Sequence, residues 1–169
     1  MGIAHPTSKP LPVVAVSACL LGQAVRYDGK HKYTSLIAEE LAKYCHLIPI
    51  CPEVEIGLGI PRDKIQLTQV GNEVRVLKVT DRQSDVTHSL TDLAAQFLKQ
   101  HQLSGLVLQD KSPSCGIENV KLFSEEGVQI GISSGVFAAT IRQLQPNLRI
   151  VQASQLQSQN DVEVFVSSL

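Results

Sequence analysis

Three of the four cysteines in this chain each follow a short apolar segment. Cys19 ends the segment VVAVSAC, Cys51 ends LIPIC, and Cys115 follows GLVLQ after the turn DKSPS. Short apolar runs bounded by turn residues are typical of buried parallel strands, and ligands of open α/β sheets bind outside the carboxyl ends of the strands. We therefore expect these three thiols, although far apart in sequence, to meet in one crevice, an arrangement that suits a metal centre.

Thiolate sulfur is the ligand that iron-sulfur clusters, zinc and copper(I) select. Cluster iron is normally held by four protein thiolates. A 4Fe-4S cluster with three protein ligands keeps one iron open for an exogenous ligand, as a catalytic zinc keeps one position for water, and the open iron then acts as a Lewis acid. The spacing of the cysteines matches no compact zinc or ferredoxin motif, so zinc stays an alternative on the residues alone.

Buried structural thiols are the other alternative, because free cysteine is among the residue types most often buried. Cys45 fits this interpretation, since it lies on the apolar stripe of a predicted helix and no loop rich in proline or glycine follows it.

Composition restricts the class of protein. The chain has 169 residues, of which 43% are hydrophobic and 18% charged, with a net charge of -1, so no basic field attracts nucleic acid. No apolar run reaches the roughly 18 residues that a membrane span needs, and the start MGIAHPTSKP lacks the regions of a signal peptide. We expect a cytoplasmic protein without disulfides, with a flexible tail at 1–11 and one domain at 12–169; nothing in the sequence specifies an oligomeric state.

Apolar spacing predicts the elements that must position the cysteines. We expect parallel strands at about 12–17, 47–50, 105–108 and 147–153, and helices at about 35–45, 90–98 and 134–144. Thr87 or Ser89 is available to cap the second helix. The segments IQLTQV and EVRVLKV alternate apolar and polar residues around Gly71-Asn72, which predicts a hairpin. The alternation in the C-terminal segment DVEVFVSSL predicts an edge strand.

This order of elements predicts an α/β fold: a mainly parallel sheet flanked by helices, with a β-hairpin insertion.

The chain resembles the thiouracil desulfurases, known as domain of unknown function 523, over about residues 13 to 157. The matching segments occur in the same order and are SACLLGQAVRYDG, CPEVEIGLGIPR, DVTHSL, KSPSCG and GVFAATIRQLQPNLRIVQASQL. The resemblance implies a 4Fe-4S cluster with one open iron, held by the matching residues Cys19, Cys51 and Cys115, and it leaves out Cys45. The chain departs from the family at Ile56, within EIGLGIPR, where a Gly-Gly-Leu run is more usual, and in a shortened stretch after KSPSCG.

The resemblance also implies a reaction, the removal of sulfur from a small thiolated pyrimidine such as thiouracil without net redox change. A carboxyl group must then activate the attacking water or protonate the ring nitrogen or the leaving sulfide. Glu53, two residues after a proposed ligand, is the first candidate, and Asp28 in VRYDG is the second. Each has an ordinary alternative, because Glu53 could simply pair with Arg62 in a loop, and Asp-Gly is a common turn sequence.

Hydroxyl groups and cations complete the predicted site. Ser112 and Ser114 could orient the substrate or relay a proton, or they could serve only the turn before the third cysteine. Ser17 could hydrogen-bond the substrate or a cluster sulfur. Arg26 and Lys111 lie in site loops and could hold an anionic group or the charge of the cluster, although such side chains are usually solvated.

Two other functions are compatible with the sequence. One is a sensor or scaffold that binds a cluster or zinc without turnover. The other is desulfuration of 4-thiouridine in transfer RNA, against which the near-neutral charge and the lack of an appended RNA-binding domain count.

Overall fold

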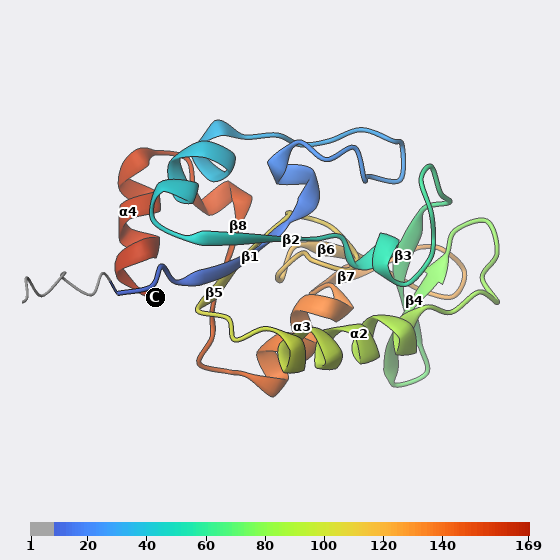
Figure 1. Ribbon diagram of the computed structural model, residues 1–169. Helices are drawn as coiled ribbons and strands as arrows, with labels where there is room; N and C mark the ends of the chain where they lie inside the picture. The colour runs from blue at the N-terminus through green and yellow to red at the C-terminus, as the bar shows by residue number, and fades with distance from the viewer. Residues whose placement is uncertain (1–8) are drawn as a thin grey trace, which may run out of the picture.

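Two four-stranded sheets form the framework of the protein (Figure 1). The computed structural model describes residues 9–169, so residues 1–8 of the predicted tail lie outside the described residues. No helix in the described part of the chain is long and apolar enough to cross a membrane.

The first sheet is entirely parallel and carries the cysteines. Its strand order is β2-β1-β5-β8, and its strands are β1 (Val13–Ser17), β2 (His46–Ile50), β5 (Gly105–Leu108) and β8 (Arg149–Gln152). All four residues of the central strand β5 are buried, as expected for a strand covered on both faces. The four parallel strands predicted from the sequence are therefore confirmed.

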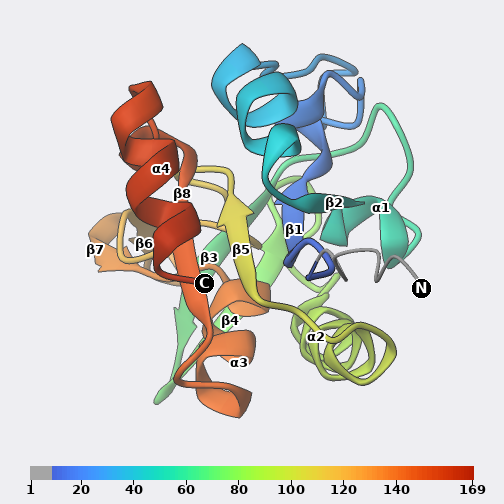
Figure 2. The same ribbon diagram turned by 60° about the vertical axis from the view of Figure 1, so that its left-hand side comes forward.

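Helices cover both faces of this sheet, as Figures 1 and 2 show. One face packs against α2 (Thr87–Gln100) and α3 (Val136–Leu144), with Phe97 and Phe137 in the core between them. The other face packs against α4 (Gln159–Ser167) and a short helical segment at residues 36–43. The predicted helix at 35–45 is a wide π turn, η2 (Leu36–Glu40), followed by a tight 3-10 turn, η3 (Leu41–Lys43).

The C-terminal segment is a helix, so the predicted edge strand there is wrong. The apolar residues Val162, Phe165 and Val166 of α4, with Leu169 just beyond it, recur at helical spacing and pack on the first sheet. Ser158 caps the helix, because its hydroxyl accepts the Asp161 N–H at 3.2 Å while the Asp161 carboxylate accepts the Ser158 N–H at 2.9 Å. This reciprocal cap and the three-to-four-residue spacing outweigh the local alternation.

The second sheet is mixed, with the order β4-β3-β6-β7. The hairpin of β3 (Ile65–Val70) and β4 (Glu73–Lys78) is confirmed, and it pairs through β3 with a second hairpin that the sequence analysis did not predict. That hairpin consists of β6 (Val120–Phe123) and β7 (Gln129–Ser133). The predicted α/β class is confirmed, but the first hairpin is part of a second sheet and not a lone insertion.

Helices α2 and α3 also contact the second sheet, since Leu90 and Val136 pack with Leu67 of β3. We propose on this basis that residues 12–169 form one domain. The predicted cap of α2 is wrong, because Val86 precedes the helix and the Asp85 carboxylate, not Thr87 or Ser89, accepts the first helical N–H, that of Thr87, at 2.9 Å. The Thr87 hydroxyl instead accepts the Val76 N–H at 2.8 Å and fastens the start of the helix to β4.

Candidate functional site

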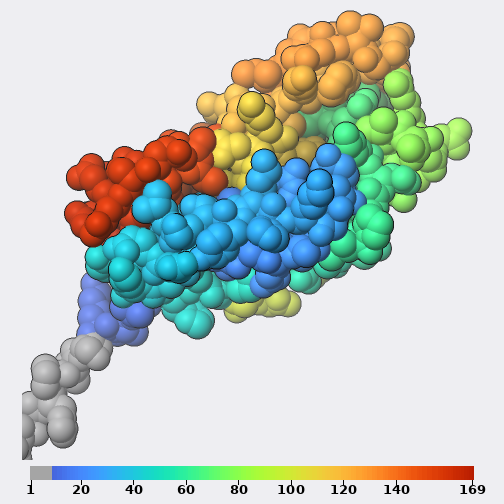
Figure 3. All heavy atoms as spheres, turned by 90° about the horizontal axis from the view of Figure 1, so that it is seen from above, coloured from blue at the N-terminus to red at the C-terminus, as the bar shows by residue number. Residues whose placement is uncertain are grey.

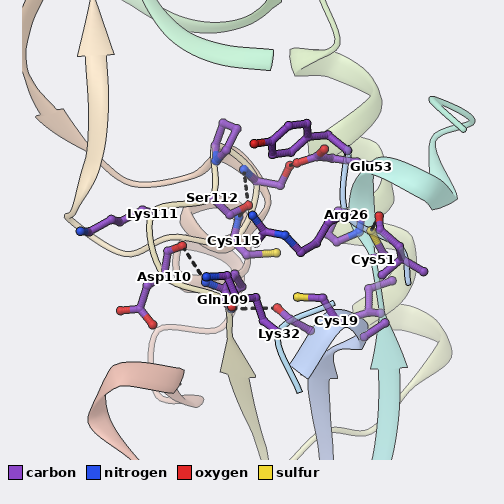
Figure 4. A pocket seen from close by; sticks show the side chains of 18 of the residues that line it. Cys19, Arg26, Lys32, Cys51, Glu53, Gln109, Asp110, Lys111, Ser112 and Cys115 are labelled. Atoms are coloured by element: carbon purple, nitrogen blue, oxygen red, sulfur yellow. Dashed lines mark hydrogen bonds between the residues drawn. The ribbon is translucent and has the colours of Figure 1, made fainter. Parts of the chain in front are cut away.

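Cys19, Cys51 and Cys115 line one cavity of about 330 Å³ (Figure 4). Cys19 lies in the 3-10 turn η1 (Ala18–Leu21) directly after β1, and Cys51 lies between β2 and the short helix α1 (Pro52–Glu55). Cys115 lies in the loop after β5. Because β2, β1 and β5 are parallel neighbours, their carboxyl ends share one edge of the sheet. The structure thus brings together the three cysteines that the sequence analysis singled out.

Most of the other predicted site residues line the same cavity: Ser17, Arg26, Glu53, Lys111, Ser112 and Ser114. Asp28 does not line it. The Asp28 carboxylate accepts the Lys30 N–H at 3.1 Å and lies 3.7 Å from Arg26 Nε, within the loop before β2. This is the ordinary turn chemistry given as the alternative for Asp28. Cys45 is also elsewhere, in the core beneath α4.

The loop between β1 and η2 forms one wall of the cavity. It contributes Val25, Tyr27 and Lys32 in addition to Arg26. Figure 3 shows the segment between β1 and β2, in blue to cyan, across this face of the molecule beside the red C-terminal helix. The cavity therefore lies between the sheet edge and a long connecting loop, a common place for binding residues.

Burial suppresses ionisation of the three thiols. It raises the pKa of the Cys19 thiol to about 11, with Arg26 opposing the shift and negative charge on Cys51 adding to it. Burial also raises the pKa of Cys115, against a hydrogen bond from the Ser17 hydroxyl, and it raises the pKa of Cys51. Thiolates gathered here need a positive partner, and a bound metal supplies one by replacing the thiol protons.

The loop that carries Cys115 is held by a dense set of hydrogen bonds. Ser112 Oγ accepts the N–H groups of Ser114 at 3.2 Å and Cys115 at 3.1 Å. The N–H of Gly135, directly before α3, donates to the Gly116 carbonyl at 2.7 Å. The start of α3 therefore fixes the position of the third cysteine, and Ser112 serves the turn as well as lining the cavity.

Glu53 lies at the cavity wall with both carboxylate oxygens engaged. Arg62 Nε donates to Oε2 at 2.8 Å, and the Ser114 hydroxyl donates to Oε1 at 3.1 Å. The side chains of Glu53 and Arg62 are 12% and 5% exposed, so this ion pair is largely shielded from solvent. The predicted alternative for Glu53, pairing with Arg62, is thus correct as a contact, yet the pair itself lines the cavity.

Ser17 and Lys111 differ in how they take part. Ser17 is buried between the central strands, where its hydroxyl accepts the Gln109 N–H at 2.9 Å, and it lines the cavity beside Cys115. Lys111 is exposed, and Figure 4 shows its side chain extending away from the cysteines. Ser17 therefore supports the cysteine loop, whereas the Lys111 ammonium does not face the sulfurs.

The sequence analysis missed several residues of the cavity wall, namely Tyr27, Lys32, Arg62, Gln109 and Asp110. Gln109 and Asp110 directly follow β5, so their place at a strand end was a usable signal. Arg62 reaches the cavity from a loop, and only its pairing with Glu53 had been considered.

A parallel sheet that brings three cysteines and a paired carboxylate to one cavity defines an α/β enzyme with a thiol-lined site. The chain belongs to the 2-thiouracil desulfurase family, whose model matches residues 14–153. This finding confirms the resemblance seen in the sequence.

Two individual proteins are similar to this chain. The "Uncharacterized protein YbbK" of Bacillus subtilis (strain 168) is 31% identical over 162 residues, which cover 89% of this chain and 99% of that protein. A solved structure, described as the 4Fe-4S-dependent thiouracil desulfidase TudS, matches with a TM-score of 0.71 and 28% identity, over 94% of this chain and 99% of that one. The match extends over the whole α/β fold.

Proposed function

We propose that this enzyme converts thiouracil to uracil and sulfide, using a 4Fe-4S cluster held by Cys19, Cys51 and Cys115. The convergence of these three cysteines with Glu53 in one cavity carries the proposal. Membership of the 2-thiouracil desulfurase family supports the reaction, and the description of TudS as 4Fe-4S-dependent supports the cofactor.

The donor set fits a cluster better than a single zinc ion. Among residues 9–169, no three His, Cys, Asp or Glu side chains are placed to hold one metal ion together. Tetrahedral zinc needs its sulfur ligands at about 2.3 Å from a common point, whereas cysteines that bind a cluster are distributed over its separate irons. Three cysteines that reach one cavity from separate strand ends are in keeping with the second arrangement, and on this ground we propose a cluster.

The proposed chemistry is hydrolysis of a thiocarbonyl: the C=S group and water give C=O and hydrogen sulfide, with no change of oxidation state. When bound, a cluster with one open iron supplies a Lewis acid for the substrate sulfur. Glu53 takes a proton from the attacking water and returns it to the ring nitrogen or the departing sulfur. Ser114 donates to Glu53 Oε1 at 3.1 Å and can relay this proton.

The remaining cavity residues would bind and orient the substrate. The cavity of about 330 Å³ must hold both the cluster and the substrate, and it already lies at the lower end of the range for small-molecule sites, about 300–1,000 Å³, so we propose a substrate no larger than a single base. Ser112 offers a hydroxyl proton, since its oxygen already accepts two N–H groups. Arg26 is the cation that we propose for polar substrate groups or for the cluster charge, because Lys111 extends away from the cysteines (Figure 4).

The proposal is tested by anaerobic reconstitution with iron and sulfide, followed by assays of 2-thiouracil, 4-thiouridine and transfer RNA that contains 4-thiouridine. We expect a brown protein that releases one sulfide for each uracil formed. Bound iron without sulfide release from either compound would favour a sensor or scaffold. Release only from transfer RNA containing 4-thiouridine would favour the RNA substrate.

Gly135 provides a structural test of the cysteine loop. A Cβ at this position would lie 2.5 Å from the Ser114 carbonyl carbon and 2.7 Å from the Cys115 nitrogen, so Gly135→Ala must displace the backbone that carries the third cysteine. We expect lower iron content after reconstitution and a free energy of unfolding reduced by about 1–3 kcal/mol. Iron analysis and thermal unfolding measure both.

The matched control is Gly131→Ala in β7, where a Cβ meets nothing within 4 Å. This variant should bind iron as the original chain does. Equal iron content in the two variants would show that the start of α3 does not fix the position of Cys115.

A further inference from the structure

One guanidinium group connects the carboxylate, a cysteine and two loops of the site. Arg62 Nε donates to Glu53 Oε2 at 2.8 Å, and Nη1 donates to the carbonyls of Val25 at 2.8 Å and Gly59 at 3.0 Å. Nη2 lies 3.9 Å from Cys51 Sγ. All three nitrogens of this almost fully buried side chain are therefore in use.

The contacts of Arg62 constrain Glu53 in a specific way. Arg62 occupies Oε2, which leaves Oε1 for the Ser114 hydroxyl. Within residues 9–169, Arg62 is the only basic side chain that forms an ion pair with Glu53, whereas Arg26 lies beside Asp28. Because its Nη1 is bound to the Val25 and Gly59 carbonyls, the guanidinium is itself fixed in place, and its Nε then fixes Oε2 of the carboxylate.

Arg62 also ties the connecting loop to the cysteine edge of the sheet. Its backbone N–H donates to the Tyr27 carbonyl at 3.0 Å, in addition to the side-chain bond to Val25. Cys51 Sγ lies 3.7 Å from the same Val25 carbonyl. The loop wall, the second cysteine and the carboxylate thus share one anchor.

We infer that Arg62 is a positioning residue of the desulfuration site, which holds the Glu53 carboxylate with Oε1 directed to Ser114 and the substrate. The inference rests on the proposed function. It assigns Arg62 an effect on the rate of the chemical step, transmitted through Glu53, beyond its part in holding the loops together.

The test compares Arg62→Gln with Arg62→Lys. Glutamine removes the positive charge and the set of guanidinium donors. Lysine keeps the charge, but its single ammonium group cannot reach Glu53 and both carbonyls at once. We expect kcat for 2-thiouracil to fall about 100-fold in Arg62→Gln, the order expected when a reacting group is misplaced, and less in Arg62→Lys. KM should change far less than kcat. Iron content, the visible spectrum and thermal unfolding report the state of the cluster and the fold independently of activity.

A double-mutant cycle separates positioning from mere structural support. If Arg62 acts through Glu53, Arg62→Gln should lower kcat little further in a Glu53→Gln background, because coupled residues are not additive. A structural role predicts the same loss in both backgrounds. The control is Arg142→Gln, which removes an exposed pair with Glu118 of similar length, 3.2 Å, and should leave kcat and iron content unchanged.

Equal losses in both backgrounds, a loss that follows iron content, or an unchanged kcat in Arg62→Gln would overturn the inference. If Arg62→Gln does not fold, the same cycle with Arg62→Lys decides. A reconstituted original chain that binds iron but releases no sulfide would overturn the proposed function together with this inference. If the original chain is active and the losses in kcat from Arg62→Gln and Glu53→Gln are additive, the inference is overturned but the proposed function is not.

Discussion

Replacement of Cys51 by alanine should give a protein that neither holds iron nor releases sulfide from 2-thiouracil. Cys51 is one of three thiols that line the cavity, and a cluster that already lacks a fourth protein ligand tolerates no further loss. Cys51 is also less buried than Cys19 and Cys115, so the truncation disturbs the core least. Iron and acid-labile sulfide analysis, visible absorption and sulfide release measure the effect.

Cys45→Ala is the matched control for this substitution. Cys45 is 3% exposed in the core beneath α4, and burial raises the pKa of its thiol to about 11. The variant should unfold more easily, by about 1 kcal/mol, yet keep its iron and its activity. Iron retained in Cys51→Ala at the level of Cys45→Ala would remove Cys51 from the proposed ligand set.

The convergence of the cysteines was predictable because it depends on local features. Each cysteine follows a short apolar run, and each run forms a strand of the parallel sheet. Parallel strands place their carboxyl ends at one edge, so strand assignment alone predicted that residues far apart in sequence would meet. The same reasoning located Glu53, Ser112 and Ser114, which immediately follow strands or adjoin the cysteines.

Features that depend on tertiary contacts were less predictable. The alternating residues of β7 form an exposed edge strand, whose partner β6 has only four residues, so no strong apolar run marks this hairpin. The sequence DVEVFVSSL satisfies a strand pattern and a helix pattern, and packing against the first sheet together with the Ser158 cap favours the helix. Arg62 reaches the site because of the path of its loop, which local sequence does not specify.

Asp28 shows the limit of proximity in sequence. It lies in the same long loop as Arg26, which does line the cavity, but its carboxylate accepts a backbone N–H of its own turn. Asp-Gly is a turn signal for this physical reason. A carboxylate in a site loop is therefore a candidate only when its side chain is free of the turn that carries it.

Glu53→Gln should lower kcat for thiouracil desulfuration by about 10²–10⁴-fold, the usual contribution of a general acid-base group, while the protein keeps its iron. The carboxamide has nearly the shape of the carboxylate, and its oxygen can still accept from Arg62 Nε, but it cannot take a proton from water. Of the two candidate carboxylates, Glu53 lines the cavity and Asp28 does not. We therefore expect Asp28→Asn to lower kcat far less than Glu53→Gln does.

Glu55→Gln controls for the charge change, because Glu55 belongs to the same short helix α1 but is exposed and is not among the residues that line the cavity. Steady-state kinetics at matched iron content compare the three variants. A larger loss in Asp28→Asn than in Glu53→Gln would transfer the proton-handling role to Asp28 and would require the loop at 22–32 to move during the reaction. A loss in Glu53→Gln that follows iron content would instead make Glu53 a support for the cluster site, because a group that only moves protons has no reason to affect iron binding.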